Sequence, residues 1–150
     1  MQQYIALLRG INVSGQKKIK MAELVNHCQD IGLQEVSTYI QSGNICFTSS
    51  SIDEQALAIQ LQDKITQQYG FDVPVIILNK APEQQKVSQL LSYVKAPEKM
   101  IINEQVSYLH CPNGYGKSKL SNNFVESKLN LVATTRNLKT VEKLISLLNS

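Results

Sequence analysis

Arginine is scarce in this chain, which draws attention to the two positions that carry it. Of fifteen cationic residues only Arg9 and Arg136 are arginines, and both lie in short runs built from glycine, asparagine and threonine. The planar guanidinium of arginine matches carboxylates and phosphates with two parallel hydrogen bonds, which the ammonium of lysine does not. The two runs are therefore candidates for binding an anionic ligand.

The sequence also lacks the features of exported and membrane proteins. No apolar run approaches the roughly 20 residues that span a bilayer, and Arg9 comes too early for a secretory signal peptide. The three cysteines, Cys28, Cys46 and Cys111, are an odd number, and each lies in an apolar pattern. This usage is typical of free thiols in a reducing compartment. We therefore expect a cytoplasmic protein with no membrane partner.

A strong charge of either sign is missing as well. The formal net charge is +3 and the pI is near 8.7, which is less basic than a dedicated duplex-DNA binder. Hydrophobic residues make up 43% and charged residues 18% of the chain, as in an ordinary folded domain. A chain of 150 residues can bury one sizeable core or two small ones.

The first half of the chain follows the order β-α-β-β-α-β. Short apolar runs predict strands, and apolar residues at helical spacing predict helices. The predicted elements are a strand at 3–9, a helix from 21 to 32, a hairpin within 36–48, a helix from 53 to 70 and a strand at 73–78. This is the ferredoxin-like order, a four-stranded antiparallel sheet covered by two helices, and we predict it for residues 1–80.

The second half repeats part of that order. The predicted elements are a helix at 87–94, a hairpin of strands 100–102 and 106–111, a helix at 120–129, a strand at 131–134 and a final helix at 138–148. The opening strand is absent, because residues 79–82 lead from a strand directly into a helix. Residues 81–150 therefore form an incomplete α+β subdomain with an extra C-terminal helix. Either its sheet has an exposed edge or a segment is missing.

Four polar runs at junctions between these elements hold the candidate ligand-binding residues. Such loops present backbone N–H groups that bind anions, above all where a loop leads into a helix. The candidates are Arg9, Gly10 and Asn12 in the first run, Gln41, Ser42, Gly43 and Asn44 in the second, Asn113, Gly114, Tyr115, Gly116, Lys117 and Lys119 in the third, and Thr135, Arg136 and Asn137 in the fourth.

Each run also has an interpretation without a ligand. Asn137 caps the last helix and leaves Arg136 in solvent. The second run is a hairpin turn whose glycine and asparagine take left-handed conformations. The third is a glycine-rich turn, because a true phosphate loop requires glycine where Cys111 stands. Arg9 ends a strand and pairs with a nearby carboxylate.

The usual catalytic residue types are missing from the four runs. None of the twelve acidic residues and neither histidine lies in them, so no acid–base pair or carboxylate metal site is predicted there. His110 and Cys111 are neighbours in a predicted strand and point to opposite faces, which argues against a cysteine–histidine nucleophile. His27 lacks the ligand spacing of a zinc site. We assign no metal, cofactor or catalytic residue.

Five stretches of the sequence resemble an uncharacterised bacterial family, domain of unknown function 1697 (DUF1697). They are YIALLRGIN at 4–12, KMAEL at 20–24, YIQSGN at 39–44, PNGYG at 112–116 and ATTRN at 133–137. The resemblance implies a cytosolic bacterial protein of two α+β subdomains, and implies no activity, substrate or cofactor. Ser14 replaces a usual glycine of the family, and Leu138 replaces a common tryptophan. The family also looks longer between Leu78 and Glu83.

Three functions remain open at this point. A binding module would gather the loops on one face and hold a phosphorylated ligand, a nucleotide or nucleic acid, with the two arginines. An enzyme on a small anionic substrate would use Tyr115 or Ser118, although no base is visible to activate a hydroxyl. An interaction protein would recruit a partner or a second copy at a sheet edge. The sequence favours the first and leaves the ligand and the oligomeric state open.

Overall fold

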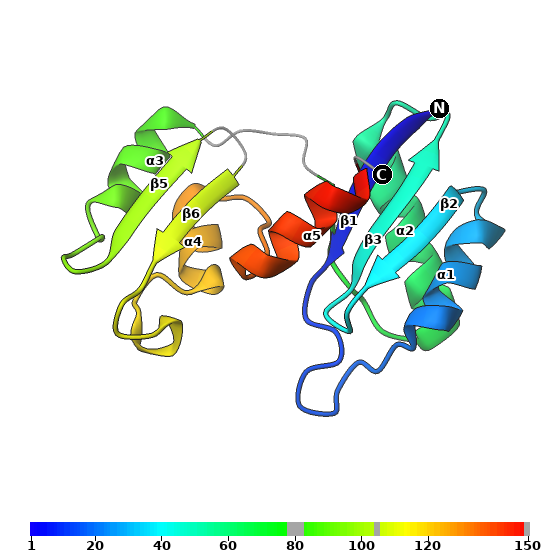
Figure 1. Ribbon diagram of the computed structural model, residues 1–150, viewed down its shortest axis with the longest axis horizontal. Helices are drawn as coiled ribbons and strands as arrows, with labels where there is room; N and C mark the ends of the chain where they lie inside the picture. Colours follow the sequence, from blue (N-terminus) through cyan, green and yellow to red (C-terminus); the bar gives the residue numbers. More distant parts are fainter. Residues whose placement is uncertain (78–82, 104–105, 149–150) are drawn as a thin grey trace. The chain divides into compact units, whose positions relative to one another are not determined.

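The computed structural model describes residues 1–77, 83–103 and 106–148. Within these ranges the protein is a mixed α+β fold with five α-helices and a four-stranded antiparallel sheet (Figure 1). The chain divides into two compact units. Unit 1 comprises Met1–Leu78 and Arg136–Ser150, and unit 2 comprises Asn79–Thr135. No helix in the described part of the chain has the length and apolar character needed to cross a membrane.

Unit 1 contains the elements that the sequence predicts, in the predicted order. They are β1 (Gln2–Leu8), α1 (Met21–Asp30), β2 (Gln34–Tyr39), β3 (Asn44–Ser49), α2 (Glu54–Tyr69) and β4 (Val75–Ile77), followed at the C-terminal end by α5 (Leu138–Leu148). The sheet order is β2-β3-β1-β4, and every neighbouring pair is antiparallel. The strand predicted at 73–78 is shorter than expected, and its last residue lies outside the described ranges.

The core of unit 1 lies between one face of this sheet and helices α1 and α2. Alternate residues of β1 and β3 point into it together with one apolar stripe from each helix. The buried members include Tyr4, Ala6, Leu8, Ile45 and Phe47 from the strands, Leu24 and Cys28 from α1, and Leu57, Leu61 and Ile65 from α2. Burial raises the pKa of the Cys28 thiol to about 12, so this cysteine is an inert part of the core.

The ends of α2 show how local sequence sets the element bounds. Asp53 precedes the helix, and its side chain accepts a hydrogen bond from the Ala56 N–H at 3.0 Å. Gly70 follows the helix with a left-handed φ of 76°, and its N–H donates to the carbonyl of Thr66. Both residues are the start and stop signals from which the helix was predicted.

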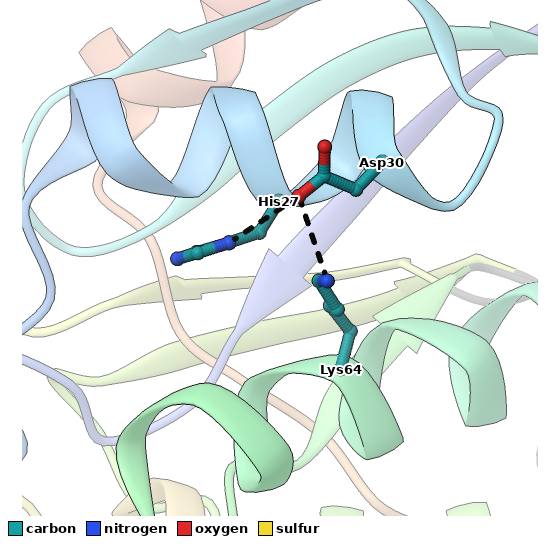
Figure 2. Close-up of polar contacts among 3 residues, drawn as sticks. All are labelled: His27, Asp30 and Lys64. Atoms are coloured by element: carbon teal, nitrogen blue, oxygen red, sulfur yellow. Dashed lines mark ion pairs between the residues drawn. The ribbon is translucent and has the colours of Figure 1, made fainter.

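Helices α1 and α2 are joined at their surface by a small charged cluster. Figure 2 shows Asp30 of α1 between His27 of the same helix and Lys64 of α2. The Asp30 carboxylate is 3.5 Å from the Lys64 ammonium and 3.8 Å from His27 Nδ1. Because Asp30 is largely exposed, its ion pair with Lys64 adds little stability. His27 also meets the ring of Tyr69 edge-on.

The last helix belongs to unit 1, not to the second subdomain as its sequence position suggested. Cys46 and Thr48 of β3 point away from the main core and are nevertheless buried. Helix α5 packs against β3 and buries its own Thr140 and Leu144 (Figure 1). The predicted boundary between residues 80 and 81 therefore assigns α5 to a different unit from the one in which it packs.

Unit 2 is smaller and is built around a single hairpin. Its elements are α3 (Gln84–Leu91), β5 (Lys99–Asn103), β6 (Val106–His110), a short 3₁₀ helix (Tyr115–Lys117) and α4 (Asn122–Leu129). Strands β5 and β6 pair antiparallel, and Val87, Leu90, Leu120 and Leu129 form the buried centre of the unit. The predicted missing opening strand concerns residues 79–82, which lie outside the described ranges.

The strand predicted at 131–134 is wrong. Residues 131–137 have no regular secondary structure. The Ala133 N–H donates to the Glu126 carboxylate at 3.0 Å, and the Ala133 carbonyl accepts from the Asn122 side-chain amide at 3.0 Å. Side chains of α4 thus satisfy the backbone groups of Ala133 that a neighbouring strand would otherwise bind, and the run pairs with no strand.

Candidate functional site

The first two polar runs meet in unit 1, where Asn12 connects them. Its side-chain Nδ2 donates to the Gln41 carbonyl at 2.7 Å and to the Ile19 carbonyl at 3.0 Å. Its Oδ1 accepts from the Ile19 N–H at 2.9 Å. The amide therefore closes the loop between β1 and α1 and fixes it to the β2–β3 turn. The side-chain amide of Asn12, which could bind a ligand, is used here to hold the loop in place.

Arg136 brings the fourth run to the same place. Its Nε donates to Asn44 Oδ1 at 2.7 Å, and its Nη2 donates to the Leu8 carbonyl at 2.7 Å. The same Nη2 lies 3.1 Å from the Ser42 carbonyl and 3.4 Å from the Gly43 carbonyl. These four acceptors are neutral oxygens at the end of β1 and in the β2–β3 turn. The guanidinium thus holds together two segments that are far from it in the sequence.

The surroundings of Arg136 differ from the interpretation that leaves this side chain in solvent. The side chain is half-buried instead of solvated, and burial lowers its pKa. Asn137 is the helix cap, since its Oδ1 accepts from the Thr140 N–H at 2.9 Å. The capping interpretation therefore holds for Asn137, while Arg136 clamps the turn through the contacts above.

The second run is a turn, as predicted, with a different backbone conformation. The residues with positive φ are Ile40 at 53° and Gly43 at 85°, whereas Asn44 is the first residue of β3. Asn44 is fully buried, and its Nδ2 donates to the Tyr39 carbonyl at 2.8 Å and to Ser42 Oγ at 3.1 Å. The asparagine is needed here for its side-chain amide, which bonds the turn on one side and Arg136 on the other.

The remaining candidates of the first and fourth runs occupy separate positions. Arg9 is half-buried, and its backbone N–H donates to the Pro74 carbonyl at 3.0 Å. Gly10 is exposed, with a φ of 75°. Thr135 belongs to unit 2, where its Oγ1 donates to Asn122 Oδ1 at 2.9 Å. The fourth run is thus shared between the two units.

The third run lies in unit 2 and borders a cavity. The cavity has a volume of about 520 Å³, which is the size of a small-molecule site. Its lining consists of Lys95, Ala96, Pro97, Glu98, Cys111, Asn113, Gly114, Lys117 and Ser118. Three predicted candidates, Asn113, Gly114 and Lys117, are therefore brought together around one hollow. Their cationic partner in the lining is Lys95, which sequence reasoning did not select.

The other candidates of the third run do not line this cavity. The Tyr115 hydroxyl accepts a hydrogen bond from the Asn122 N–H at 2.7 Å and so caps the start of α4. Gly116 lies in the 3₁₀ turn, and Lys119 lies over two aromatic rings elsewhere in the unit. The capping bond gives Tyr115 a structural role.

Glu98 is a second residue of this cavity that the sequence did not reveal. Its Oε2 accepts hydrogen bonds from Ser118 Oγ and, at 3.4 Å, from Cys111 Sγ. Ser118 Oγ in turn accepts from the Leu120 N–H at 3.0 Å. The hairpin explains one of these contacts, because β5–β6 pairing sets Lys99 opposite His110, and Glu98 and Cys111 are the next residues along the chain from this pair. The available signal in the sequence was the predicted hairpin, since its two strands bring the residues at their outer ends close together.

Cys111 donates a hydrogen bond to this carboxylate through its thiol. Burial is the largest influence on the Cys111 thiol and raises its pKa, a hydrogen bond with Ser118 lowers it, and the hydrogen bond and negative charge of Glu98 raise it. A thiol with a raised pKa is protonated at neutral pH, which agrees with its donating to Glu98.

The positive charge of the chain is concentrated in unit 2. Its range, 79–135, contains seven lysines and four glutamates, an excess of three positive charges. The two ranges of unit 1 together contain eight cationic and eight acidic residues, which cancel. The net charge of +3 therefore belongs to the unit that holds the cavity.

The fold is a mixed α+β fold whose polar runs form turns, a helix cap and the border of a cavity. The chain belongs to the DUF1697 family of proteins of unknown function, whose model matches residues 1–110. It is similar in structure to the conserved bacterial protein SP0830 from Streptococcus pneumoniae, with a TM-score of 0.72 and 25% sequence identity over 99% of this chain and 98% of that chain. No functionally curated protein matches it. The predicted family membership is confirmed.

Proposed function

We propose that this protein is a binding module for a phosphorylated or other anionic ligand, and that the ligand occupies the cavity of unit 2. The observation that carries the proposal is the placement of Lys95 and Lys117 around a hollow bordered by the Asn113–Gly114 turn. Two lysines and one glutamate line it, and the carboxylate of Glu98 accepts hydrogen bonds from Ser118 and Cys111. An anion between the two lysines is favoured by their charge and by the positive charge of the unit.

For unit 1 we propose a ferredoxin-like scaffold. The element order β-α-β-β-α-β and the sheet order β2-β3-β1-β4 support it. In this proposal Arg136 maintains the loops of the scaffold and the lysines of unit 2 contact the ligand, because the Arg136 donors described above are directed at loop carbonyls and Asn44. We further propose a cytoplasmic location, supported by three free cysteines.

Changing Lys117 to glutamine is expected to weaken the binding of a small phosphate compound about tenfold, the effect of losing one charge-assisted contact of about 1.4 kcal/mol. Lys95→Gln is expected to act in the same direction. The measurement is calorimetric titration with pyrophosphate and with a nucleoside 5′-monophosphate at low ionic strength.

The matched control for these variants is Lys86→Gln. It removes the same charge from the same unit, but Lys86 lies on α3 beside Glu83 and does not line the cavity. The affinity of the Lys86→Gln variant for pyrophosphate and for the nucleoside 5′-monophosphate should equal that of the wild type. Absence of binding by the wild-type protein, or equal affinities of Lys117→Gln and wild type, would contradict the proposed function.

A second candidate function is an enzyme, and the contact between Ser118 and Glu98 favours it. Glu98 supplies the base that the sequence did not show, since its carboxylate can take the Ser118 proton as the hydroxyl attacks an ester. The bond to the alcohol then breaks, the alcohol leaves with the proton held by Glu98, and water hydrolyses the ester formed on Ser118. Turnover of phosphate or carboxylic esters should then disappear in both Ser118→Ala and Glu98→Gln and persist in Cys111→Ala. Turnover that survives in Ser118→Ala rules this candidate out.

A further inference from the structure

A second cationic cluster lies in unit 2, formed by Tyr93, Lys119, Phe124 and Lys128, and none of its members lines the cavity. Tyr93 follows helix α3, and Phe124 and Lys128 belong to α4. The rings of Tyr93 and Phe124 meet edge to face, with centroids 5.1 Å apart. We refer to these four residues as the lysine–aromatic cluster.

Both lysines of the cluster lie over the same two rings. The Lys119 ammonium is 5.0 Å from the Tyr93 centroid and 5.7 Å from that of Phe124. The Lys128 ammonium is 4.8 Å and 5.5 Å from the same two centroids. Lys128 also donates to the Tyr93 hydroxyl at 3.2 Å. Ring and hydroxyl contacts of this kind hold an ammonium in place without neutralising it.

The two ammonium groups therefore repel each other. Since each lies within 5.0 Å of the Tyr93 centroid, they are no more than about 10 Å apart, a distance at which charges still interact at moderate salt. Within the described part of the chain, no carboxylate forms an ion pair with Lys119 or Lys128. An anion bound between them would relieve the repulsion.

We propose that the lysine–aromatic cluster binds single-stranded nucleic acid. The two ammonium groups bind phosphates of the nucleic-acid backbone. When an ammonium moves from its aromatic ring to a phosphate, it uncovers a ring face on which an unpaired base stacks. Interleaved cationic and half-buried aromatic side chains are the elements that single-strand sites combine. A duplex keeps its base faces inside its own stack, so it gains nothing from the rings. The excess positive charge of unit 2 adds long-range attraction.

The test is fluorescence anisotropy with a short labelled oligouridine, measured over a range of salt concentrations. The double variant with Lys119→Gln and Lys128→Gln is expected to lower the slope of log affinity against log salt by about 0.7 for each lysine removed. The control Lys99→Gln removes a lysine of β5 in the same unit, outside the cluster, and should leave the slope unchanged.

The aromatic half of the cluster is tested with a pair of Tyr93 variants. Tyr93→Leu removes a stacking surface and is expected to weaken binding about 5- to 100-fold at every salt concentration, whereas Tyr93→Phe keeps the ring and should retain affinity. Circular dichroism confirms that each variant is folded. Because Lys119 is exposed, its change leaves the fold intact and keeps the test valid if Tyr93→Leu does not fold.

Three results would overturn the inference: no binding of oligouridine at low salt, equal affinity for a duplex or an abasic strand, or slopes unaltered by the lysine changes. The cavity is tested separately by Lys117→Gln with pyrophosphate. Oligouridine binding that persists in Lys117→Gln and Lys95→Gln supports the cluster even if the cavity binds no phosphate compound, so the two proposals fail independently.

Discussion

Replacing Arg136 with alanine is expected to destabilise unit 1 by about 3 kcal/mol, because a buried acceptor then loses a charged donor. Asn44 is fully buried, and its Oδ1 accepts a hydrogen bond from Nε of Arg136. The carbonyls of Leu8 and Ser42 accept hydrogen bonds from Nη2 of the same side chain. In the alanine variant these oxygens lie beside an apolar methyl group or an imperfectly placed water. The β2–β3 turn and the end of β1 should both loosen.

The lysine variant separates charge from geometry at this position. Lysine keeps the positive charge but replaces the planar fork with a single ammonium, which cannot match the directions of four acceptors on two segments. Arg136→Lys is therefore expected to recover only part of the lost stability. Lys139→Ala serves as the control, since this exposed residue of α5 should change stability by less than about 0.5 kcal/mol.

Urea unfolding measures these effects, and native-state hydrogen exchange of β1 and β3 amides locates them. Exchange should accelerate in both strands of the Arg136→Ala variant and in neither strand of the Lys139→Ala variant. If Arg136→Ala unfolds at the same urea concentration as wild type, the guanidinium does not clamp the turn. Ligand binding by Arg136 is then the interpretation to test.

The elements of unit 1 could be predicted from the sequence because their signals are local. Helix α2 begins at a capping aspartate and ends at a left-handed glycine, and its apolar residues repeat at helical spacing. The continuous apolar run likewise predicts a strand at β1, and the structure adds that its alternate residues Tyr4, Ala6 and Leu8 face the core. Such patterns describe a residue and its near neighbours, which is sufficient for element type and order.

The candidate site could be predicted only in part, because its contacts join distant segments. The motif runs marked the turns correctly, but the bond from Arg136 to Asn44 spans 92 residues, and no local pattern distinguishes a clamp from a ligand contact. Glu98 and Ser118 are 20 residues apart and meet through the fold of unit 2. The strand predicted at 131–134 failed for a related reason, since side chains of α4 replace the partner strand.

Changing Gly43 to alanine is expected to be about as damaging as losing Arg136, at about 3 kcal/mol. Gly43 has a φ of 85°, where a side chain costs roughly 1–2 kcal/mol. A Cβ at this position would also approach Leu8 Cβ and Ile11 Cδ1 to 2.7 Å each. Leu8 and Ile11 are buried core residues that cannot move aside freely, so overpacking adds to the backbone strain.

Gly10→Ala is the matched control, because it imposes the backbone strain without the collision. Gly10 has a φ of 75°, and a Cβ there would meet nothing within 4 Å. Its loss of stability in urea should be about 1 kcal/mol, the cost of the left-handed conformation alone. The difference in lost stability between Gly43→Ala and Gly10→Ala then measures how closely the turn approaches β1. The Leu8 N–H donates to the Gly43 carbonyl at 2.8 Å at this point. Equal losses in the two variants would mean that the turn stands away from the core and that Arg136 does not hold it there.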